Sequence, residues 1–311
     1  MTASVFIDGA VGTTGLEIAD RLASRGEFTL LTLPEQRRKD DAARAEALNA
    51  ADFVILCLPD DAARAAVAMI DNPRTRVIDA SSAHRVADGW TYGFPEAVGR
   101  ETIAAAMRVS NPGCYATAFI ALVAPLVKAG LLPADWPYTV NAVSGYSGGG
   151  KALIARFEDD PDIAFRDYGL GLGHKHVPEM TRLTGLVHPP VFAPAVIPAH
   201  RGMVVEVPLP LAAMAALGKQ AGAPEALRQC LADAYAGGRI VTVHGDVPDE
   251  LLLRRSGLPN DRLDLYVFGA QNGSQARLIA MLDNLGKGAA GAAVQNLNLM
   301  AGLPETAGLQ L

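Results

Sequence analysis

"SVFIDGAVGTTGLEIADRLA" (residues 4–23) decides the fold of this chain. An apolar run ends at Asp8, a glycine-rich turn follows, and a helical pattern begins near Leu16. A glycine turn between a strand and a helix lets backbone approach a pyrophosphate, which then lies at the helix N-terminus. The spacing is GxxGxxG rather than GxGxxG, but its place directly after the first strand predicts a dinucleotide-binding turn. A tight turn that needs positive φ is the simpler alternative.

Strand and helix patterns alternate along the first third of the chain, and the sequence pattern changes after that. Strands separated by helical patterns of about 10–15 residues indicate βαβ units and a parallel sheet with right-handed crossovers. After residue 114 the predicted strands are separated by long connections rich in Pro and Gly, which indicates an α+β domain with a mixed or antiparallel sheet. The predicted strands are 4–8, 27–33, 52–59, 76–82, 138–144, 203–209, 239–245 and 262–270, with helices at 15–24, 60–70 and 282–302.

Composition narrows the class of protein. The 311 residues are 50% hydrophobic and 19% charged, so a packed core in one large domain or two is expected. The net charge is −6 without a dense cationic stripe, which argues against nucleic acid but leaves room for a small anionic ligand. The three cysteines are widely spaced, and neither a secretory leader nor a credible membrane span is seen. We therefore expect a cytoplasmic protein that does not bind membranes.

Cations follow the second predicted strand. A cofactor without a 2′-phosphate usually meets an acidic residue at this point, whereas "PEQRRK" (residues 34–39) offers three consecutive basic side chains. These cations suit a 2′-phosphate, so the sequence favours NADP over NAD. A solvated basic turn is the competing interpretation. The predicted cofactor contacts are Gly9, Gly12, Thr13, Thr14, Gly15, Arg37, Arg38, Pro59 and Ser81.

"SNPGCYATAFI" (residues 110–120) places a cysteine at a predicted helix start. Asn111 can cap the helix and Pro112 fits its first position, so Cys114 falls in the first turn. The positive helix end favours a thiolate, and this position suits a nucleophile. Pro125 should kink or interrupt the helix. A buried structural cysteine is the alternative, and we expect it for the other two cysteines, at positions 57 and 230.

Two further motifs could take part in binding a substrate or in assisting a thiolate. "GYSGGGKA" (residues 145–152) nearly matches a P-loop, but Ala152 stands where Mg²⁺ would need a hydroxyl, so an ATPase is not expected. Its backbone N–H groups would still suit an anionic substrate. "GHKHVPEM" (residues 173–180) supplies His174 and His176 as partners for a thiolate. No third or fourth ligand has a matching spacing, so no metal site is expected. The four isolated histidines read as structural.

A dinucleotide turn, an activated cysteine and a histidine together suggest one chemistry. The thiolate attacks an activated acyl group, a thioester forms, and hydride from a nicotinamide reduces it to an aldehyde. The chain here resembles the shorter N-acetyl-γ-glutamyl-phosphate reductases, within the aspartate-semialdehyde dehydrogenase-like superfamily. The resemblance runs from the first strand to the last helix. Its motifs are "GAVGTTG", "SNPGCYAT", "SGYSGGGK", "GHKHVPEM", "IPAHRGM" and "KGAAGAAVQNLNLMAG".

This resemblance implies an α/β architecture: a Rossmann dinucleotide-binding domain and an α+β catalytic domain like that of glyceraldehyde-3-phosphate dehydrogenase. The expected domains are residues 1–112 with 283–311, which bind NADP, and 113–282, for catalysis and dimerisation. The family uses NADPH to reduce N-acetylglutamyl 5-phosphate to the 5-semialdehyde, with release of phosphate, in arginine biosynthesis. By the resemblance Cys114 is the nucleophile, while the histidine of "HKHVPE" is either His174 or His176. Val177 stands where the family often has Thr. Homo-oligomers, dimers or tetramers, are implied.

The substrate's phosphate and carboxylate need cations or clusters of N–H groups. The predicted contacts are Asn111, Arg85, Ser144, Gly145, Ser147 and Arg201. Three alternatives stay open. One is a sister enzyme, such as aspartate-semialdehyde dehydrogenase, acting on another acyl phosphate, because pocket contacts set acyl specificity. The others are a dinucleotide-binding regulator with an inert Cys114 and a cysteine hydrolase that needs no nicotinamide.

Overall fold

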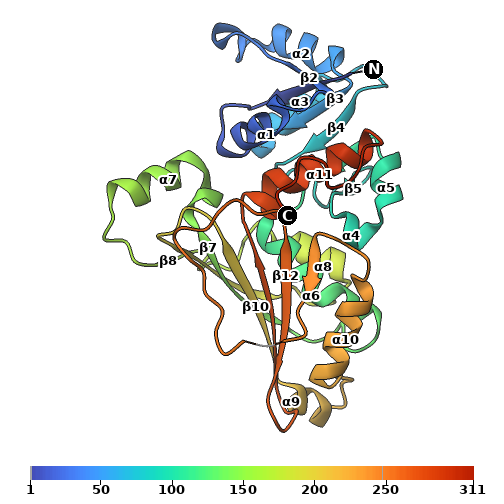
Figure 1. The fold of residues 1–311 in the computed structure, drawn as a ribbon, viewed down its shortest axis with the longest axis vertical. Helices are drawn as coiled ribbons and strands as arrows, with labels where there is room; N and C mark the ends of the chain where they lie inside the picture. Colours follow the sequence, from blue (N-terminus) through green and yellow to red (C-terminus); the bar gives the residue numbers. More distant parts are fainter. Residues whose placement is uncertain (1, 247) are drawn as a thin grey trace. The chain divides into compact units, whose positions relative to one another are not determined.

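The chain folds into two compact units, which the computed structural model describes over residues 2–246 and 248–311. The first unit comprises Met1–Pro112 and Ala289–Leu309, and the second comprises Gly113–Gly288 and Gln310–Leu311 (Figure 1). Across those described ranges, no helix combines the length and the apolar character needed to cross a bilayer.

The first unit contains a six-stranded sheet with the order β2-β1-β3-β4-β6-β5, in which every neighbouring pair is parallel. This confirms the parallel sheet expected from the alternation of strand and helix. Its strands are β1 (Ala3–Asp8), β2 (Phe28–Leu31), β3 (Phe53–Leu56), β4 (Arg76–Asp79), β5 (Thr91–Tyr92) and β6 (Arg108–Ser110). Its helices are α1 (Thr13–Ala23), α2 (Asp41–Ala50), α3 (Asp60–Ala68), α4 (Pro95–Val98), α5 (Arg100–Ala105) and α11 (Gly291–Met300), with a 3₁₀ turn at Glu35–Arg37.

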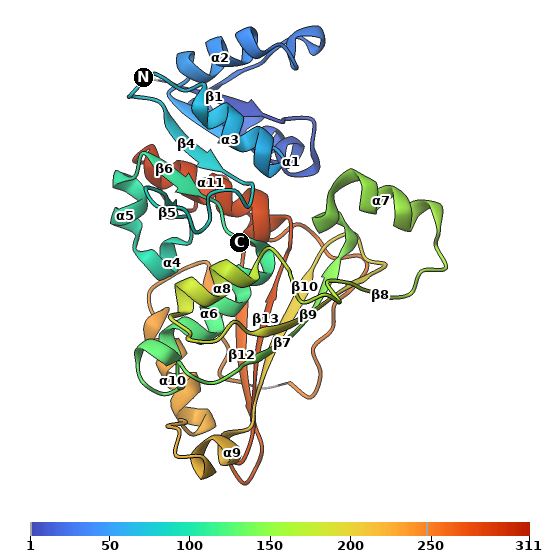
Figure 2. The ribbon, with the colours of Figure 1, turned by 180° about the vertical axis from the view of Figure 1, so that it is seen from behind.

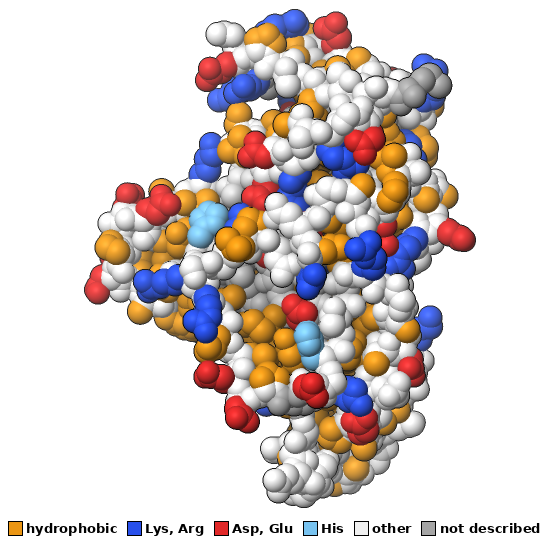
Figure 3. Space-filling model, viewed as in Figure 1, with side chains coloured by type: hydrophobic (Ala, Val, Ile, Leu, Met, Phe, Trp, Pro, Cys, Tyr) orange, Lys and Arg blue, Asp and Glu red, His pale blue; other side chains and the backbone are white. Residues whose placement is uncertain are grey.

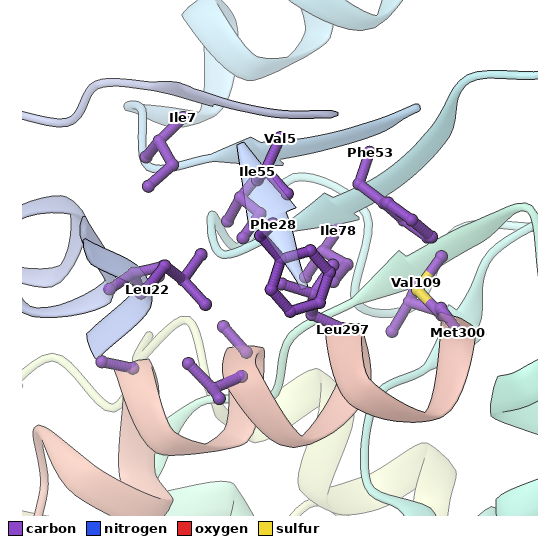
Figure 4. Close-up of a cluster of buried hydrophobic side chains, with 14 of the residues drawn as sticks. Val5, Ile7, Leu22, Phe28, Phe53, Ile55, Ile78, Val109, Leu297 and Met300 are labelled. Atoms are coloured by element: carbon purple, nitrogen blue, oxygen red, sulfur yellow. The ribbon is translucent and has the colours of Figure 1, made fainter. Parts of the chain in front are cut away.

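Two hydrophobic clusters cover the two faces of this sheet, as expected for parallel strands buried on both sides. Successive side chains of β1 point to opposite faces. Val5 and Ile7 pack with α1, α5 and α11, and Figure 4 shows Leu297 of α11 within this cluster. Phe6 instead packs with apolar side chains of α2 and α3. The C-terminal helix is thus part of the first unit's core.

The second unit is built on a mixed seven-stranded sheet with the order β11-β12-β13-β10-β7-β9-β8. The pairs β7/β9 and β11/β12 are parallel, and the other neighbours are antiparallel. Helices α6 and α10 pack on one face and α8 packs on α6 (Figure 2). The elements are α6 (Cys114–Lys128), β7 (Thr139–Gly145), α7 (Gly150–Asp159), β8 (Arg166–Asp167), α8 (Val177–Thr184), β9 (Val191–Ile197), β10 (Met203–Leu209), α9 (Leu211–Ala216), α10 (Pro224–Ala234), β11 (Val241–Val243), β12 (Leu263–Gly269) and β13 (Ala276–Leu282), with a 3₁₀ turn at Tyr146–Gly149.

The expected C-terminal helix at residues 282–302 needs correction. Leu282 is the last residue of β13, one π-helical turn follows at Gly286–Ala290, and α11 begins only at Gly291. The border between the two units accordingly lies after Gly288.

Pro125 does not interrupt its helix, because α6 continues through it to Lys128. A proline in a helix leaves the carbonyl four residues earlier without its usual N–H donor. Here the hydroxyl of Tyr235, just after α10, donates to the carbonyl of Ala121 at 2.8 Å. This hydrogen bond satisfies the buried carbonyl and joins α6 to the end of α10.

Candidate active site

The segment before Cys114 differs from the predicted cap. Asn111 does not cap α6, because its backbone N–H donates to the carbonyl of Asp79 at 2.7 Å and so extends the ladder between β6 and β4. Its side-chain amide donates to the carbonyl of Ala289 at 2.9 Å. Gly113 is the N-cap, without a side-chain cap, and Cys114 is the first helical residue. Pro112 therefore precedes the helix, while the thiol still lies at its positive end.

Two neighbours shape the backbone around Cys114 within the second unit. The N–H of Gly113 donates to Oε2 of Glu179 at 3.1 Å, and Glu179 is only 1% exposed. A Cβ at Gly288 would lie 2.8 Å from the Cβ of Cys114, so only glycine lets the π-helical turn approach the cysteine. Cys114 itself keeps partial exposure, in contrast to the buried residues 115–123 that follow it. The backbone of the candidate nucleophile is thus fixed by its neighbours, while its side chain remains partly exposed.

The two candidate histidines have different surroundings. The ring of His174 accepts the backbone N–H of His176 at Nδ1 (3.1 Å), and its Nε2 lies 3.4 Å from the hydroxyl of Tyr168. His176 is the N-cap of α8 and is 5% exposed. Both rings pack against Tyr115, the residue after Cys114, with centroid distances of 5.9 and 5.7 Å. The second unit therefore brings Cys114, His174 and His176 around one tyrosine.

Hydrogen bonds from His174 continue through two phenols. Tyr168 donates to the hydroxyl of Tyr115 at 3.3 Å, and Tyr115 donates to the carbonyl of Ala195 at 3.3 Å. Burial is the main cause that raises the pKa of Tyr168 to about 12, and burial also raises the pKa of Tyr115. Both hydroxyls therefore stay protonated near neutral pH. Tyr168 uses its proton in the bond to Tyr115, so its oxygen can accept a proton from His174. Nδ1 of His174 already accepts an N–H, so the single ring proton of a neutral His174 is assigned to Nε2.

The loop that resembles a P-loop does not present a row of N–H groups to a ligand. The N–H groups of Gly145, Tyr146 and Ser147 donate to the carbonyls of Gly202, Ala199 and His200 at 2.8–3.1 Å. The hydroxyl of Ser147 accepts a hydrogen bond from the side chain of Asn284. Ser144 is 3% exposed, and its hydroxyl donates to a neighbouring carbonyl. The expected use of this backbone as an anion cradle is wrong at residues 145–147, because these N–H groups already have acceptors.

Arg201 is anchored by an ion pair that sequence reasoning missed. Its Nη1 lies 2.7 Å from Oδ2 of Asp283, and the two side chains are 12% and 4% exposed. Asp283 also accepts the backbone N–H groups of Asn260 and Leu285. The carboxylate thus holds Arg201 in one orientation beside the strand end of β13.

In the first unit, the predicted cofactor turn lies at the carboxyl end of the sheet. Gly9 has φ of +89°, and a Cβ there would lie 2.3 Å from the carbonyl oxygen of Cys57. Gly12 is the N-cap of α1 and provides no side-chain cap. The first-turn N–H groups of Thr13, Thr14 and Gly15 are therefore available to an anion. The turn fits a dinucleotide pyrophosphate.

The other predicted cofactor residues flank this edge of the sheet. Pro59 follows β3 and is the N-cap of α3. Ser81 follows β4, but its N–H and hydroxyl both donate to Asp79, at 2.9 and 2.7 Å. Arg37 and Arg38 follow β2 and are exposed. They can therefore reach a ligand phosphate without breaking an existing contact.

Of the predicted substrate contacts in the first unit, Arg85 and Asn111 are joined. Nε of Arg85 donates to the carbonyl of Asn111 at 3.1 Å, which places the guanidinium beside the end of β6. The amide of Asn296 in α11 donates to the Oδ1 of Asn111 at 3.1 Å.

Sequence reasoning missed Tyr168, Glu179 and Asp283. Glu179 follows Pro178 at a helix start, where an acidic side chain is a usual first-turn residue, so its position could have drawn attention. The hydrogen bonds of Tyr168 and Asp283 join segments far apart in the chain, and no local pattern encodes them.

Comparisons with known proteins show which family the chain is similar to. Residues 4–106 match the semialdehyde dehydrogenase NAD binding domain, and residues 114–284 match the semialdehyde dehydrogenase dimerisation domain. The chain is 51% identical to N-acetyl-gamma-glutamyl-phosphate reductase 2 of Pseudomonas putida over 97% of both chains. It is 50% identical to the N-acetyl-gamma-glutamyl-phosphate reductase of Chelativorans sp., over 96% of this chain and 98% of that one. The fold is similar to aspartate semialdehyde dehydrogenase II of Vibrio cholerae, with a TM-score of 0.70, 18% identity and coverage of 96% and 98%.

Proposed function

The chain belongs to the N-acetyl-γ-glutamyl-phosphate reductases, within the semialdehyde dehydrogenase family, and we propose that it catalyses the reaction of that name. N-acetylglutamyl 5-phosphate is reduced to N-acetylglutamate 5-semialdehyde, and phosphate is released. This reaction is a step in arginine biosynthesis. The observation that carries the proposal is identity of about half of all residues to relatives of that name over nearly the whole chain.

Cys114 is the nucleophile in this proposal. Its thiolate forms a C–S bond to the acyl carbon, and the C–O bond to phosphate breaks with its electron pair leaving on phosphate. When bound, the reduced nicotinamide supplies a hydride to the thioester carbon. The resulting C–S bond cleavage returns the thiolate and releases the aldehyde. The helix N-terminus at Cys114 stabilises the thiolate before attack and after release.

We assign proton transfer to His176 and a positioning role to His174. Both ring nitrogens of His174 already have partners, the backbone N–H of His176 at Nδ1 and Tyr168 at Nε2. Protonation of Nδ1 would break the first of these contacts, so His174 is poorly suited to gain and lose a proton. His174 instead fixes the backbone of His176 at the start of α8. His176 can then take the thiol proton and protonate the oxygen that develops negative charge.

The cofactor of this proposal is NADPH, held by Arg37 and Arg38 at the 2′-phosphate. Replacing both arginines with alanine should raise KM for NADPH by about 10–100-fold, since hydrogen bonds to charged groups are the strong ones. KM for NADH should change by less than about threefold, because NADH lacks that phosphate. Initial rates with each cofactor measure this. Arg64→Ala is the control, since Arg64 is an exposed arginine on α3 that pairs with Asp61, three residues earlier on the same helix. Equal losses for both cofactors would contradict the assignment.

The reverse reaction tests the function directly. The enzyme is mixed with N-acetylglutamate 5-semialdehyde, phosphate and NADP⁺, and NADPH formation is followed at 340 nm. Formation that requires phosphate supports the proposed reaction. Activity with aspartate semialdehyde but not with the acetylated aldehyde would keep the chemistry and reject the substrate.

We propose that the second unit also forms the contact of a homodimer or of a larger homo-oligomer. Among the residues that the structure describes, α6 and α10 pack on one face of its sheet, and hydrophobic side chains gather over β10 and β12 on the other face (Figure 3). The partly exposed side chains include Val204, Tyr266, Phe268 and Met281. Exposed apolar faces of this kind are typical of interaction surfaces. The matched family domain is described as a dimerisation domain.

A reducing compartment, and hence the cytoplasm, fits the thiols of this chain. All three cysteines are free in the structure. A chain that depends on one reactive thiol needs surroundings that keep it reduced. We therefore infer a cytoplasmic location for the proposed enzyme.

A further inference from the structure

Arg166 of the second unit lies beside the candidate active site, and its charge is not balanced by an acidic side chain. It begins β8, the two-residue strand at the edge of the sheet, and is half-buried. Its guanidinium carbon lies 4.7 Å from the centre of the ring of Tyr168. Among the residues that the structure describes, no carboxylate pairs with Arg166 and no acceptor bonds to its guanidinium. Its donors are therefore available to a ligand.

Tyr168 connects Arg166 to the residues around Cys114. The hydroxyl of Tyr168 lies 3.4 Å from Nε2 of His174 and donates to the hydroxyl of Tyr115 at 3.3 Å. Tyr115 directly follows Cys114 in the chain. Burial is the main cause that raises the pKa of Tyr168, while Cys114 raises this pKa further and Arg166 lowers it. Arg166 and the thiol therefore lie close to the same phenol, and all these residues belong to one unit.

The contact with Tyr168 orients the guanidinium without using its donors. A cation–π contact depends on the charge of the guanidinium and involves no hydrogen bond, so the N–H groups can still bind an acceptor. Asp167 follows on the strand and is exposed, and successive strand residues point to opposite faces. Arg201, in contrast, already has its charge balanced by Asp283. Arg166 is thus suited to a carboxylate that arrives with a ligand.

The substrate of the proposed reaction carries such a carboxylate. In N-acetylglutamyl 5-phosphate, four carbon–carbon bonds separate the acyl carbon from the α-carboxylate. With the acyl carbon at Cys114, the α-carboxylate must bind beside the thiol rather than against it. Contacts through Tyr115 and Tyr168 lead from Cys114 to Arg166, which lies at such a position. The phosphoryl group is bonded directly to the acyl carbon and must lie closer to the thiol.

We propose that Arg166 binds the α-carboxylate of the acyl substrate and so selects N-acylated α-amino acid derivatives over acyl phosphates that lack this group. The inference rests on the proposed function, because that function supplies the substrate. Tyr168 acts as a positioning residue that holds the guanidinium. The phosphoryl group could form the same charge-assisted hydrogen bonds and is the competing ligand.

Steady-state kinetics of the reverse reaction separate the two anions. Arg166→Ala should raise KM for N-acetylglutamate 5-semialdehyde by about 10–100-fold, whereas KM for phosphate and for NADP⁺ should each stay within about threefold of wild type. Arg166→Lys keeps the charge and should recover part of the loss. Arg239→Ala removes an exposed arginine of the second unit and is the matched control. A raised KM for phosphate with an unchanged KM for the aldehyde would overturn the proposal.

An aldehyde without the carboxylate isolates the contact. 4-Acetamidobutanal is the same aldehyde with hydrogen in place of the α-carboxylate. Wild type should use it with a kcat/KM about 10–100-fold lower than that for N-acetylglutamate 5-semialdehyde, and Arg166→Ala should use the two aldehydes within about threefold of each other. A loss of equal size with both aldehydes on Arg166→Ala would mean that Arg166 only supports the fold of the site, and the proposal would be wrong.

Protection of Cys114 from alkylation keeps the inference testable if the proposed reaction fails. N-acetylglutamate should slow the reaction of Cys114 with iodoacetamide at lower concentrations than 4-acetamidobutyrate, which lacks the α-carboxylate. This difference should disappear in Arg166→Ala. If wild type does not turn over the acetylated aldehyde, the reaction is wrong, and the difference in protection still decides the subsite. Equal protection of wild type by the two compounds would overturn the assignment of Arg166.

Discussion

Replacing Cys114 with alanine should lower kcat by about 10⁴-fold or more, because the proposed route bonds the substrate only to this sulfur. The reverse reaction, followed as NADPH formation, measures the loss. The folded structure should survive, since Cys114 is partly exposed and alanine is a good helix former. NADPH binding, followed by its fluorescence, should therefore stay within about twofold of wild type. Loss of turnover with intact cofactor binding is the pattern expected for a nucleophile.

The other two cysteines provide the controls. Burial raises the pKa of Cys57 to about 12, with Asp79 and Asp8 adding to the effect. At pH 8 only about one Cys57 thiol in 10⁴ is ionised, so alkylation there should be very slow. Burial and then Asp233 also raise the pKa of Cys230. Cys230→Ala should keep nearly full activity, and iodoacetamide should label Cys114 first. Turnover in Cys114→Ala above about a tenth of wild type would rule out the thioester route.

The parallel sheet was predictable because its signals are local. The strands β1 to β4 and the helices α1 and α3 are each encoded within a few neighbouring residues, and the glycine turn at residues 9–15 follows its strand directly. The short strands β5 and β6 and the helices α2, α4 and α5 were not predicted. In the second unit, β13 was missed although Asn272 and Gly273 before it form a common hairpin signal. β9 was missed because Pro194 lies inside it. Pro194 is tolerated because its nitrogen, which lacks a hydrogen, faces the edge strand β8, which is only two residues long. On the same side the carbonyl of Pro194 accepts the N–H of Tyr168, the residue after β8.

Residues of the candidate site could be predicted only where they lie together in one short segment of the sequence. Cys114, His174 and His176 lie in recognisable stretches, whereas the pair of Arg201 and Asp283 joins residues 82 positions apart. The start of α6 was placed two residues early because Asn111 has good capping chemistry. Its N–H is used by the neighbouring strand instead, and this tertiary contact overrides the local preference.

Replacing His176 with asparagine should lower kcat by about 10²–10⁴-fold, the usual contribution of a general acid–base. The acidic limb of the pH–rate profile that reports this group should disappear with it. His174→Asn should cost only about tenfold, because an asparagine side chain can still accept the N–H of His176. Its pH profile should keep the shape of wild type. Initial rates in both directions, measured from pH 5.5 to pH 9, distinguish the two roles.

The contact of His174 with Tyr168 supplies a matched control for this assignment. Tyr168→Phe removes the hydroxyl that meets Nε2 of His174 but leaves the N–H of His176 on Nδ1. The pKa of Tyr168 is raised to about 12, so its hydroxyl stays protonated below pH 9. Removal of this hydroxyl should therefore leave the pH profile unshifted below pH 9, and kcat should fall by less than about fivefold. If His174→Asn instead removes the pH-dependent limb and His176→Asn keeps it, the proton passes through His174. The arrangement in which Nδ1 accepts the N–H of His176 and Nε2 donates to Tyr168 would then hold only in the resting enzyme.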